Sequence, residues 1–534
     1  MKKFIRLLFS GYIFIFLALI VELGVLIFFQ VAFDDVVLGI LKIFNVDTTA
    51  GWIAYLASGT GYVLVKGISF LVAFIIFLRI VNKEEDPEFK IPWIVAMVIF
   101  PFLTSVIYLI FGNHGLRKRD RIIMQGSLNS YNYHFKLNEE KKNEYEEELG
   151  EAVGSFKYLF NTTHLGVHKN NQVTYYKNGE SFFPEFIEGL KKAKEFIFME
   201  FFIISDGKEW DEVRQILIDK AKEGVDVRII FDDMGCTGTI SSFTPKRLAK
   251  YGIKCYKFHP FRPILSGVFN NRDHRKIVII DHQMAFTGGI NLADEYANEI
   301  KRFGYWKDTM VKIEGSAINN LLTIFLQNYN LCTFTISDYN MYLMHDYEKF
   351  DDEGFVMPFG DGPGGYDNAL IGEQNYINIL NYAKRKVYIS TPYLIPTYQL
   401  IDAMRNAALR GVEVNLIVPG IPDKKIVYMI AKRNFHYLLE AGVNIYTYTP
   451  GFNHMKSAMA DDELAFVGTI NFDFRSLVHH FECGTLLYKC NCMNEIRDDF
   501  IEMMEASKKV DKNYRQFFLL RWFCSILKLI TPLL

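Results

Sequence analysis

Hydrophobic residues are concentrated in long runs near the amino terminus of this 534-residue chain. Residues 7–33 are almost wholly apolar, with Glu22 as the one charged residue, and residues 91–112 form a second apolar run. As a helix, each run is long enough to cross a hydrocarbon core of about 30 Å. A third segment, 52–81, is interrupted by Lys66 and by glycines, so it is expected either to span or to re-enter the bilayer. The pattern predicts membrane segments over residues 1–115.

Positive charges beside these runs predict their orientation, because cytoplasmic flanks are enriched in Lys and Arg. One cluster precedes the first run and another follows the last run: Lys2, Lys3 and Arg6, then Arg117, Lys118, Arg119 and Arg121. Both clusters can face the cytoplasm only if the number of crossings is even. We therefore predict two full spans in a multi-pass protein whose later domains are cytoplasmic. A cleaved signal peptide is disfavoured, because the first run is too long.

After a charged linker over residues 116–172, short strands alternate with amphipathic helices. Two stretches repeat the order strand, helix, strand, strand. The first comprises 195–203, 212–224, 225–232 and 253–258, and the second comprises 386–394, 399–411, 412–418 and 443–448. This recurrence predicts two duplicated α/β domains with mostly parallel sheets, over 173–350 and 351–510. The apolar tail, 511–534, contains Arg521 and Lys528, so we expect it to lie in a membrane interface.

The two domains carry the same polar and small residues at the same spacing, 180 positions apart. The residues are His274, Lys276, Asp281, Gly289 and Asn291 in the first domain, and His454, Lys456, Asp461, Thr469 and Asn471 in the second. With residue frequencies near ~5%, one chance match of this kind is expected in about one chain in a thousand. The repeat therefore indicates one catalytic site to which both domains contribute.

These residue types suit chemistry on a phosphate group. On a strand, a histidine and a lysine two positions apart lie on one face. The lysine supplies a charge, the asparagine supplies a donor, and the small residue lets backbone approach a phosphoryl group closely. One hypothesis is that Asp281 and Asp461 each hydrogen-bond the histidine of the opposite domain and fix its orientation. A metal site is disfavoured, because each carboxylate is accompanied by a lysine that repels a cation.

Composition limits the alternatives. The chain has 59 basic and 61 acidic residues, so it lacks the positive charge of a protein that coats nucleic acid. Its seven cysteines are scattered and odd in number, which indicates free thiols rather than a disulfide framework. We predict no nucleic-acid partner, no metal and no organic cofactor.

The twin His-x-Lys-x4-Asp motifs resemble those of the phospholipase D superfamily. The segments 271–296, 390–397 and 452–477, the early apolar runs and the terminal Pro-Leu-Leu resemble the bacterial cardiolipin synthases of that superfamily, over nearly the whole chain. Departures are small: Met455 and Thr469 replace more usual residues, and the segment 52–81 is additional. The resemblance implies two phospholipase D-like domains packed around a pseudo-twofold axis, with both motifs in one site.

The resemblance also implies a reaction in a bacterial cell membrane. Two phosphatidylglycerol molecules are converted to cardiolipin and glycerol through a phosphatidyl-histidine intermediate. His274 is then the expected nucleophile and His454 the general acid and base, although the near-symmetry allows the reverse. The motif lysines and asparagines stabilise the phosphoryl oxygens. Glu200 and Glu482 are candidate supporting residues, for which purely structural hydrogen bonding is an equal alternative.

Other functions use the same residues. A hydrolase that releases phosphatidic acid, or a transferase with another acceptor such as phosphatidylethanolamine, needs the same catalytic groups. A nuclease of the superfamily is disfavoured by the apolar segments and by the net negative charge. A membrane scaffold without activity is disfavoured because both motifs are intact. The sequence does not indicate an oligomeric state.

Overall fold

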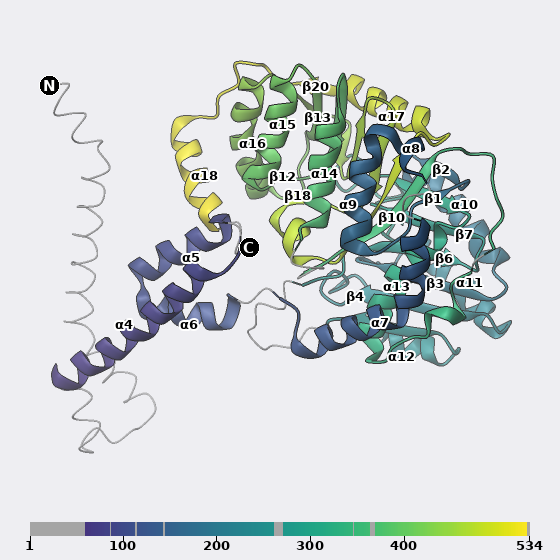
Figure 1. Cartoon of the computed structure of the whole chain (residues 1–534), viewed down its shortest axis with the longest axis horizontal. Helices are drawn as coiled ribbons and strands as arrows, with labels where there is room; N and C mark the ends of the chain where they lie inside the picture. The colour runs from purple at the N-terminus through teal and green to yellow at the C-terminus, as the bar shows by residue number, and fades with distance from the viewer. Residues whose placement is uncertain are drawn as a thin grey trace. The chain divides into compact units, whose positions relative to one another are not determined.

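The computed structural model describes residues 59–85, 87–112, 115–141, 145–260, 271–344, 346–363 and 369–530. The chain divides into two compact units, Met1–Gly112 and Asn113–Leu534, each of which is described by itself (Figure 1). The first predicted membrane segment, 7–33, lies outside the described residues.

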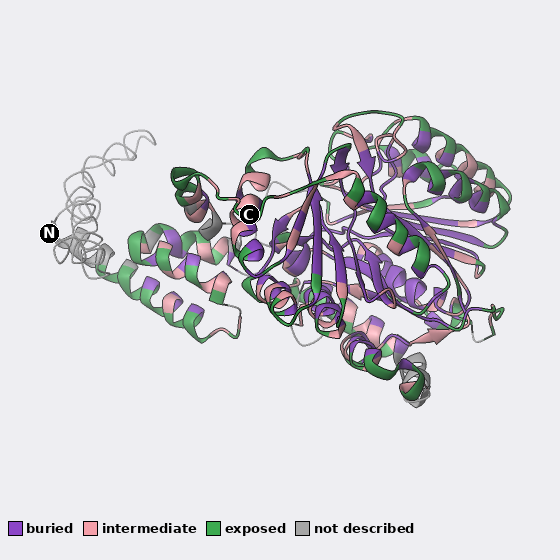
Figure 2. Cartoon of the chain, turned by 90° about the horizontal axis from the view of Figure 1, so that it is seen from above, coloured by how far each residue is buried: buried purple, intermediate pink, exposed green. Residues whose placement is uncertain are grey.

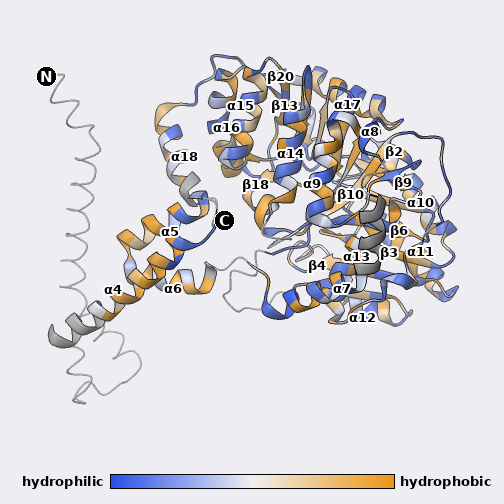
Figure 3. Cartoon of the chain, viewed as in Figure 1, coloured by the Kyte–Doolittle hydropathy of each residue, from blue (hydrophilic) through white to orange (hydrophobic). Residues whose placement is uncertain are grey.

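The described part of the first unit is helical, with α4 (Gly59–Asn82), α5 (Pro87–Ile99) and α6 (Pro101–Phe111). The prediction of one continuous helix over 91–112 is wrong, because the chain breaks between α5 and α6. Pro101 disfavours a helical conformation at the preceding residue, and Phe100 adopts φ −131° and ψ 72°. Apolar residues predominate in α4 and α5 (Figure 3). Within the described ranges, no helix combines the length and apolar composition that a membrane crossing requires.

The predicted linker contributes structure to the second unit. It contains α7 (Lys118–Lys141), α8 (Glu146–Leu149) and α9 (Val153–Thr163). Phe156 of α9 is buried, and its ring centroid lies 6.4 Å from that of Tyr488 in the second repeat. The short strand β1 (His168–Lys169) then joins the sheet of the second repeat. These contacts hold the linker against the folded unit.

The first repeat forms a seven-stranded sheet in the order β2-β9-β7-β6-β3-β4-β5. In chain order, its strands are β2 (Gln172–Tyr176), β3 (Phe196–Phe201), β4 (Asp226–Asp232), β5 (Lys254–Phe258), β6 (Lys276–Ile280), β7 (Met284–Gly288) and β9 (Met310–Glu314). Its helices are α10 (Gly179–Lys192), α11 (Lys208–Lys222), α12 (Thr244–Ala249) and α13 (Ile318–Thr333). Every residue of β3 and β6 is buried, and all except Glu200 and Lys276 are apolar.

The second repeat forms a nine-stranded sheet in the order β1-β10-β19-β17-β16-β11-β13-β14-β20. Its remaining strands are β10 (Phe355–Asp361), β11 (Lys386–Ser390), β13 (Glu413–Pro419), β14 (Asn444–Tyr448), β16 (Ser457–Ala460), β17 (Leu464–Gly468), β19 (Glu482–Tyr488) and β20 (Ser507–Lys509). Its helices are α14 (Ile371–Tyr382), α15 (Tyr398–Leu409), α16 (Lys425–Glu440), α17 (Met493–Glu505) and α18 (Phe518–Ile530). Two short strands, β12 (Leu394–Ile395) and β18 (Phe472–Asp473), pair separately.

The duplicated α/β architecture is confirmed, but the prediction of mostly parallel sheets is wrong. In the first repeat, β3, β4 and β5 are parallel, whereas β6, β7, β9 and β2 run antiparallel to their neighbours. The reason is local. Each motif strand is joined to the next by a tight turn, at 281–283 and 461–463, and a hairpin connects only antiparallel strands.

Backbone pairing across the repeats joins the two sheets. β8 (Tyr305–Lys307) of the first repeat pairs in parallel with β15 (Gly451–Asn453) of the second. In the equivalent place, Asp273 forms a parallel bridge with Phe481. Asp273 and Asn453 each precede a motif histidine, so the two contacts are related by the duplication. The exchange brings both motifs to the junction between the two sheets. Most strands of the second unit are buried (Figure 2).

Candidate active site

His454 lies beside Asp308, which belongs to the other repeat. The backbone N–H of His454 donates to the carbonyl of Lys307 at 2.7 Å. This bond places the imidazole of His454 next to Asp308, the residue after Lys307. Nδ1 of His454 is 2.5 Å from Oδ2 of Asp308, whose side chain is 1% exposed. An ionised carboxylate only accepts hydrogen bonds, so pairing with Asp308 requires the proton on Nδ1 and leaves Nε2 with its lone pair. Nζ of Lys456 also lies 2.6 Å from this Nδ1. Lys456 Nζ lies 3.5 Å from the same carboxylate.

His274 has a matching partner in Glu482, again from the other repeat. Nδ1 of His274 is 2.9 Å from Oε2 of Glu482. The carboxylate also accepts hydrogen bonds from the hydroxyls of Ser476, at 2.5 Å, and Thr469. His480 is close by, with its ring centroid 5.6 Å from that of His274. Each motif histidine is therefore oriented by a buried carboxylate that the opposite repeat supplies.

The walls of the two half-sites differ. Tyr296, Trp306 and Phe452 surround His454, with ring centroids 5.5–5.6 Å from its imidazole. On the His274 side, the ring centroids of Phe202 and His480 lie 5.0 Å and 5.6 Å from that of His274. The site thus has one strongly aromatic side and one more polar side.

Burial keeps both motif histidines neutral. It lowers the pKa of His274 to about 3 and that of His454 to about 4. Burial acts to raise the pKa of Glu482, but the neighbouring His274 and His480 hold that pKa well below its ordinary value. At neutral pH each imidazole is therefore uncharged and has a free Nε2 lone pair, while its partner is an anion.

The two motif lysines are fully buried beside the histidines. Lys276 Nζ donates to the carbonyl of His274 at 2.6 Å, and Lys456 Nζ donates to that of His454. Burial lowers the pKa of Lys276 to about 8 and that of Lys456 to about 7. An anion that enters the site favours the charged form of both lysines. The site is therefore suited to a negatively charged group.

The hypothesis that Asp281 and Asp461 bond the opposite histidines is wrong. Both residues occupy hairpin turns, with φ of 51° and 52°. Each aspartate stands seven positions after its histidine, with the motif strand between them, so it lies at the far end of that strand. There the carboxylates accept backbone N–H groups at 2.8–3.0 Å from residues 194–196 and 384–386. They fix the starts of β3 and β11.

The small motif residues make room for the carboxylates. A Cβ atom on Gly289 would lie 1.9 Å from Oδ1 of Asp308, so only glycine lets this carboxylate reach its place. In the other repeat, Thr469 donates its hydroxyl proton to Glu482. A group does approach the backbone closely at Gly289, as predicted, but it is the carboxylate of Asp308 and not a phosphoryl group.

The two motif asparagines have different contacts. Oδ1 of Asn291 accepts the N–H of Ile203 at 3.0 Å, and Nδ2 donates to the hydroxyl of Tyr296 at 2.7 Å. Oδ1 of Asn471 is buried without a partner among the described residues. Oδ1 of Asn471 is therefore available to accept a hydrogen bond from a ligand, whereas Asn291 positions Tyr296.

Glu200 lies behind the first motif strand, away from the histidines. Asn328 Nδ2 donates to its Oε1 at 2.8 Å. Burial, and then the neighbouring Asp273, raise the pKa of Glu200 well above its ordinary value. Of the two candidate supporting residues, Glu482 contacts a motif histidine, whereas Glu200 interacts with Asn328 and Asp273.

Sequence reasoning missed Asp308, His480 and Tyr296. Glu482 begins the strand that follows the second motif, 28 residues after His454, but Asp308 stands 34 residues after His274. The connection in the first repeat is six residues longer, so a comparison at equal spacing does not detect the pair. The available signal was an acidic residue near the start of the strand that pairs with each motif hairpin: Glu482 begins β19, and Asp308 lies two residues before β9.

One cluster at the site has the composition of a metal-binding site. His274, His480 and Glu482 have ligand atoms within 4.8 Å of one another, as a metal site requires. However, both oxygens of Glu482 already accept hydrogen bonds, and Lys276 contributes a nearby positive charge.

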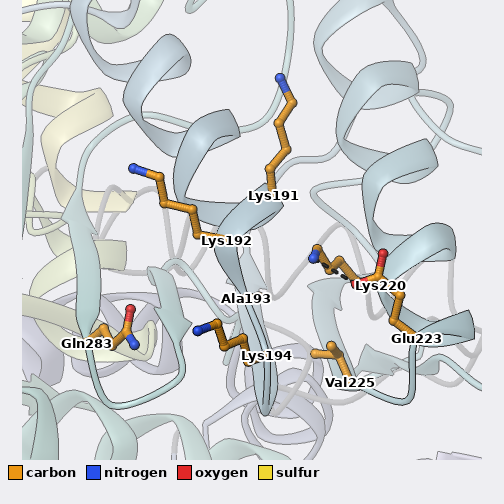
Figure 4. A pocket seen from close by; sticks show the side chains of 8 residues that line it. All are labelled: Lys191, Lys192, Ala193, Lys194, Lys220, Glu223, Val225 and Gln283. Carbon is orange, nitrogen blue, oxygen red and sulfur yellow. Dashed lines mark hydrogen bonds and ion pairs between the residues drawn. The ribbon is translucent and has the colours of Figure 1, made fainter.

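A surface pocket of about 570 Å³ lies near the hairpin turn that holds Asp281, and its lysines surround an open space (Figure 4). It is lined by Lys191, Lys192, Ala193, Lys194, Lys220, Glu223, Val225 and Gln283.

Comparisons with known proteins agree with this architecture. Residues 186–323 and 376–504 match the family model described as "Cardiolipin synthase, PLD-like domain", and residues 70–113 match "Phospholipase_D-nuclease N-terminal". The crystal structure of phosphatidylserine synthase from Haemophilus influenzae superposes with a TM-score of 0.57, at 16% identity. It covers 72% of this chain and 100% of that chain, and it supports the duplicated fold. The fold and motifs thus define a phospholipase D-like protein.

Full-length relatives narrow the class. A cardiolipin synthase of Halalkalibacterium halodurans is 31% identical over 91% of this chain and 95% of its own length. Cardiolipin synthase 2 of Bacillus anthracis is 33% identical over 87% of this chain and 90% of its own length. An uncharacterized protein of Streptococcus mutans is 41% identical, over 86% and 99% respectively. The chain belongs to the cardiolipin synthases of the phospholipase D superfamily and is a phosphatidyltransferase.

Proposed function

We propose that this cardiolipin synthase joins two phosphatidylglycerol molecules through a phosphatidyl-histidine intermediate. The observation that carries the proposal is the crossed pairing of His274 with Glu482 and of His454 with Asp308. Two neutral imidazoles, each held by a carboxylate at Nδ1, present two free Nε2 atoms to one site. One can act as a nucleophile and the other as a proton carrier.

In the first step, Nε2 of His274 attacks the phosphorus of phosphatidylglycerol. The bond between phosphorus and the glycerol oxygen breaks, and His454 gives that oxygen a proton, so glycerol leaves. In the second step, His454 removes the proton from the terminal hydroxyl of a second phosphatidylglycerol. The hydroxyl oxygen attacks phosphorus, the phosphorus–nitrogen bond breaks, and cardiolipin is released from a regenerated His274.

The buried charges support the assignment of these roles. His454 must be protonated when it acts as an acid, although burial lowers its pKa to about 4. The phosphodiester anion favours the imidazolium, as does Asp308 at 2.5 Å. Lys276 and Lys456 stabilise the charge on the phosphoryl oxygens, together with Asn471. Each such donor is expected to contribute about 10²–10³ in rate.

The proposal includes a place for the protein in the cell. The apolar segments before residue 115 anchor it in the bacterial cell membrane, where the lipid substrates are, and the basic cluster at 117–121 keeps the catalytic unit on the cytoplasmic side. This topology rests on sequence pattern. Labelling of introduced cysteines from either side of the membrane tests it.

Mass spectrometry of lipids tests the reaction. Detergent-purified enzyme is incubated with phosphatidylglycerol alone, and cardiolipin is expected with an equal amount of glycerol. Phosphatidic acid without cardiolipin would instead identify a hydrolase. The variants His274→Ala and His454→Ala should each lose turnover while remaining folded. A phosphatidyl adduct on the peptide that contains His274, accumulating in His454→Ala, assigns the nucleophile, and an adduct on His454 in His274→Ala reverses the assignment.

A further inference from the structure

Helix α18 is attached to the catalytic unit by one of its faces. Cys524 is fully buried, and its Sγ lies 3.6 Å from the carbonyl of Met429 on α16. Gln516 donates to the same carbonyl at 3.0 Å, and Nε of Arg433 donates to the Ser525 hydroxyl at 3.0 Å. These contacts determine which side of α18 faces the protein.

The opposite face of α18 is apolar and uncovered. Phe518 is 74% exposed, Leu519 and Trp522 are each 63% exposed, and Phe523 is 50% exposed. These residues are spaced as i, i+1, i+4 and i+5, so they form one stripe along the helix. Ile426, on the neighbouring α16, is 64% exposed. We call these five side chains the α16–α18 surface.

Positive charge surrounds this surface. The segments 421–440 and 511–530 contain eight basic and three acidic residues, although the whole chain has a net charge of −2. Lys424, Lys425, Lys512 and Arg515 are exposed. An apolar stripe with tryptophan and flanking Lys and Arg is the pattern of a helix that lies in the interface of an anionic membrane.

A short series of contacts connects this surface to the active site. Nζ of Lys424 lies 5.2 Å from the ring centroid of Tyr393, and the hydroxyl of Tyr393 donates to Asp423 at 2.7 Å. Asp423 also acts electrostatically on Tyr296, whose ring lies 5.6 Å from that of His454. The start of α16 is therefore close to the aromatic side of the site.

We propose that the α16–α18 surface docks the catalytic unit on a bilayer that contains anionic lipid. Phe518, Leu519, Trp522 and Phe523 enter the region between headgroups and acyl chains, and the flanking lysines contact lipid phosphates. Docking in this way holds the aromatic side of the site next to the membrane. The inference rests on exposure and charge, and it holds whichever histidine is the nucleophile and whichever acceptor lipid is used.

The test measures contact between α18 and acyl chains in the full chain. A single cysteine at position 518 (Phe518→Cys) carries an environment-sensitive fluorophore, in a His274→Ala background that leaves the lipids unchanged. Five native cysteines are buried and two are half-buried, so the introduced thiol is the most accessible among the described residues. The protein is reconstituted into phosphatidylcholine vesicles, with or without phosphatidylglycerol, in which the acyl chains carry bromine as a quencher.

We expect quenching of the probe at position 518 that increases by roughly twofold when phosphatidylglycerol is present. The double substitution Lys424→Glu and Lys425→Glu should remove this increase. As a matched control, a probe at Met341, an apolar residue of the first repeat that is 73% exposed, should not be quenched. The same protein with Phe518 retained, and so with only its native cysteines, is treated with the fluorophore to correct for labelling of native thiols.

Three results would overturn the proposal. The first is a probe at position 518 that brominated acyl chains do not quench in either lipid. The second is energy transfer between probes on two copies in place of lipid quenching, because a second copy then covers the surface. The third is quenching that phosphatidylglycerol and the lysine substitutions do not change, because anionic lipid is then not the partner.

Discussion

The variant Asp308→Asn tests the crossed pairing most directly. The substitution keeps the size of the side chain beside Gly289 and removes its charge. Asp308 Oδ2 is 2.5 Å from His454 Nδ1 and 3.5 Å from Lys456 Nζ, and the side chain is 1% exposed. An asparagine amide that donates to Nδ1 also selects the wrong tautomer, with the proton on Nε2.

The expected loss can be calculated from this geometry. A hydrogen bond to a charged group contributes about 1.5–3 kcal/mol net, and one unit charge at about 3.5 Å contributes about 5 kcal/mol at an effective dielectric constant of about 20. Because these terms overlap, we take a loss of about 3–5 kcal/mol in transition-state stabilisation. At about 1.4 kcal/mol for each factor of ten, kcat/KM falls about 10²–10⁴-fold.

The assay is cardiolipin formation from phosphatidylglycerol in mixed micelles, with thermal unfolding as a check on the fold. The matched control is Asp281→Asn, the same chemical change at a motif aspartate whose carboxylate accepts three backbone N–H groups. It should cost stability, yet reduce kcat/KM less than tenfold in the folded protein. If Asp308→Asn retains more than a tenth of the activity, or if the control loses as much, the carboxylate assignment is wrong.

Three further predictions concern pH, the Asp499 ion pair and Gly289. Lys456, with a pKa lowered to about 7, loses its charge as the pH rises, so kcat/KM should fall above about pH 7. The substitution Lys456→Arg should move this fall to higher pH. A profile of kcat/KM that stays flat to pH 9 contradicts the prediction. The buried ammonium of Lys307 lies 2.7 Å from the carboxylate of Asp499. Asp499→Ala leaves this ammonium without a counter-ion, so the free energy of unfolding, measured by chemical denaturation, should fall by about 3–5 kcal/mol. Gly289→Ala places a Cβ against Asp308. It should reduce activity as much as Asp308→Asn does and lower the unfolding midpoint less than Asp308→Asn does.

The sequence predicted which motif residues lie together better than it predicted their contacts. Identical spacing identified His274, Lys276 and their counterparts, because residues on a strand keep a fixed separation. It also assigned Asp281 and Asp461 to the histidines, since a sequence pattern does not show that the motif strand carries each aspartate to the end opposite its histidine. Asp308 escaped detection because its position depends on a loop that differs in length between the repeats.

Element types were predicted well where the apolar pattern was long. The strands around 195–203 and 225–232 and the helix around 212–224 all appear, within a few residues of the expected bounds. Strand direction was not predictable in the same way, because it depends on the turn at each hairpin. The break before Pro101 could have been predicted, because proline disfavours a helical conformation at the preceding residue. The continuous apolar pattern over 91–112 predicted one helix instead.

Comparison of the repeats also shows where the duplication has diverged. Behind the first motif strand lies a charged cluster of Glu200, Asp273 and Arg275, and the equivalent residues in the second repeat are Ser390, Asn453 and Met455. There Nδ2 of Asn453 donates to the Ser390 hydroxyl at 2.9 Å. The Arg275 guanidinium instead donates to three backbone carbonyls, those of Glu482 at 3.0 Å, Ile324 at 3.3 Å and Asp361 at 3.1 Å.

This divergence leads to a prediction that separates stability from chemistry. Arg275→Met removes three hydrogen bonds and leaves the carboxyl groups of Glu200 and Asp273 without their cation, so unfolding should become easier by about 3–5 kcal/mol. Adding Glu200→Ser and Asp273→Asn transfers the neutral set of the second repeat and should recover part of that loss, because no buried charge then lacks a partner. Denaturant unfolding measures both changes. If the triple variant is less stable than Arg275→Met alone, the cluster is not held by charge compensation, and the carbonyl contacts of Arg275 account for its contribution.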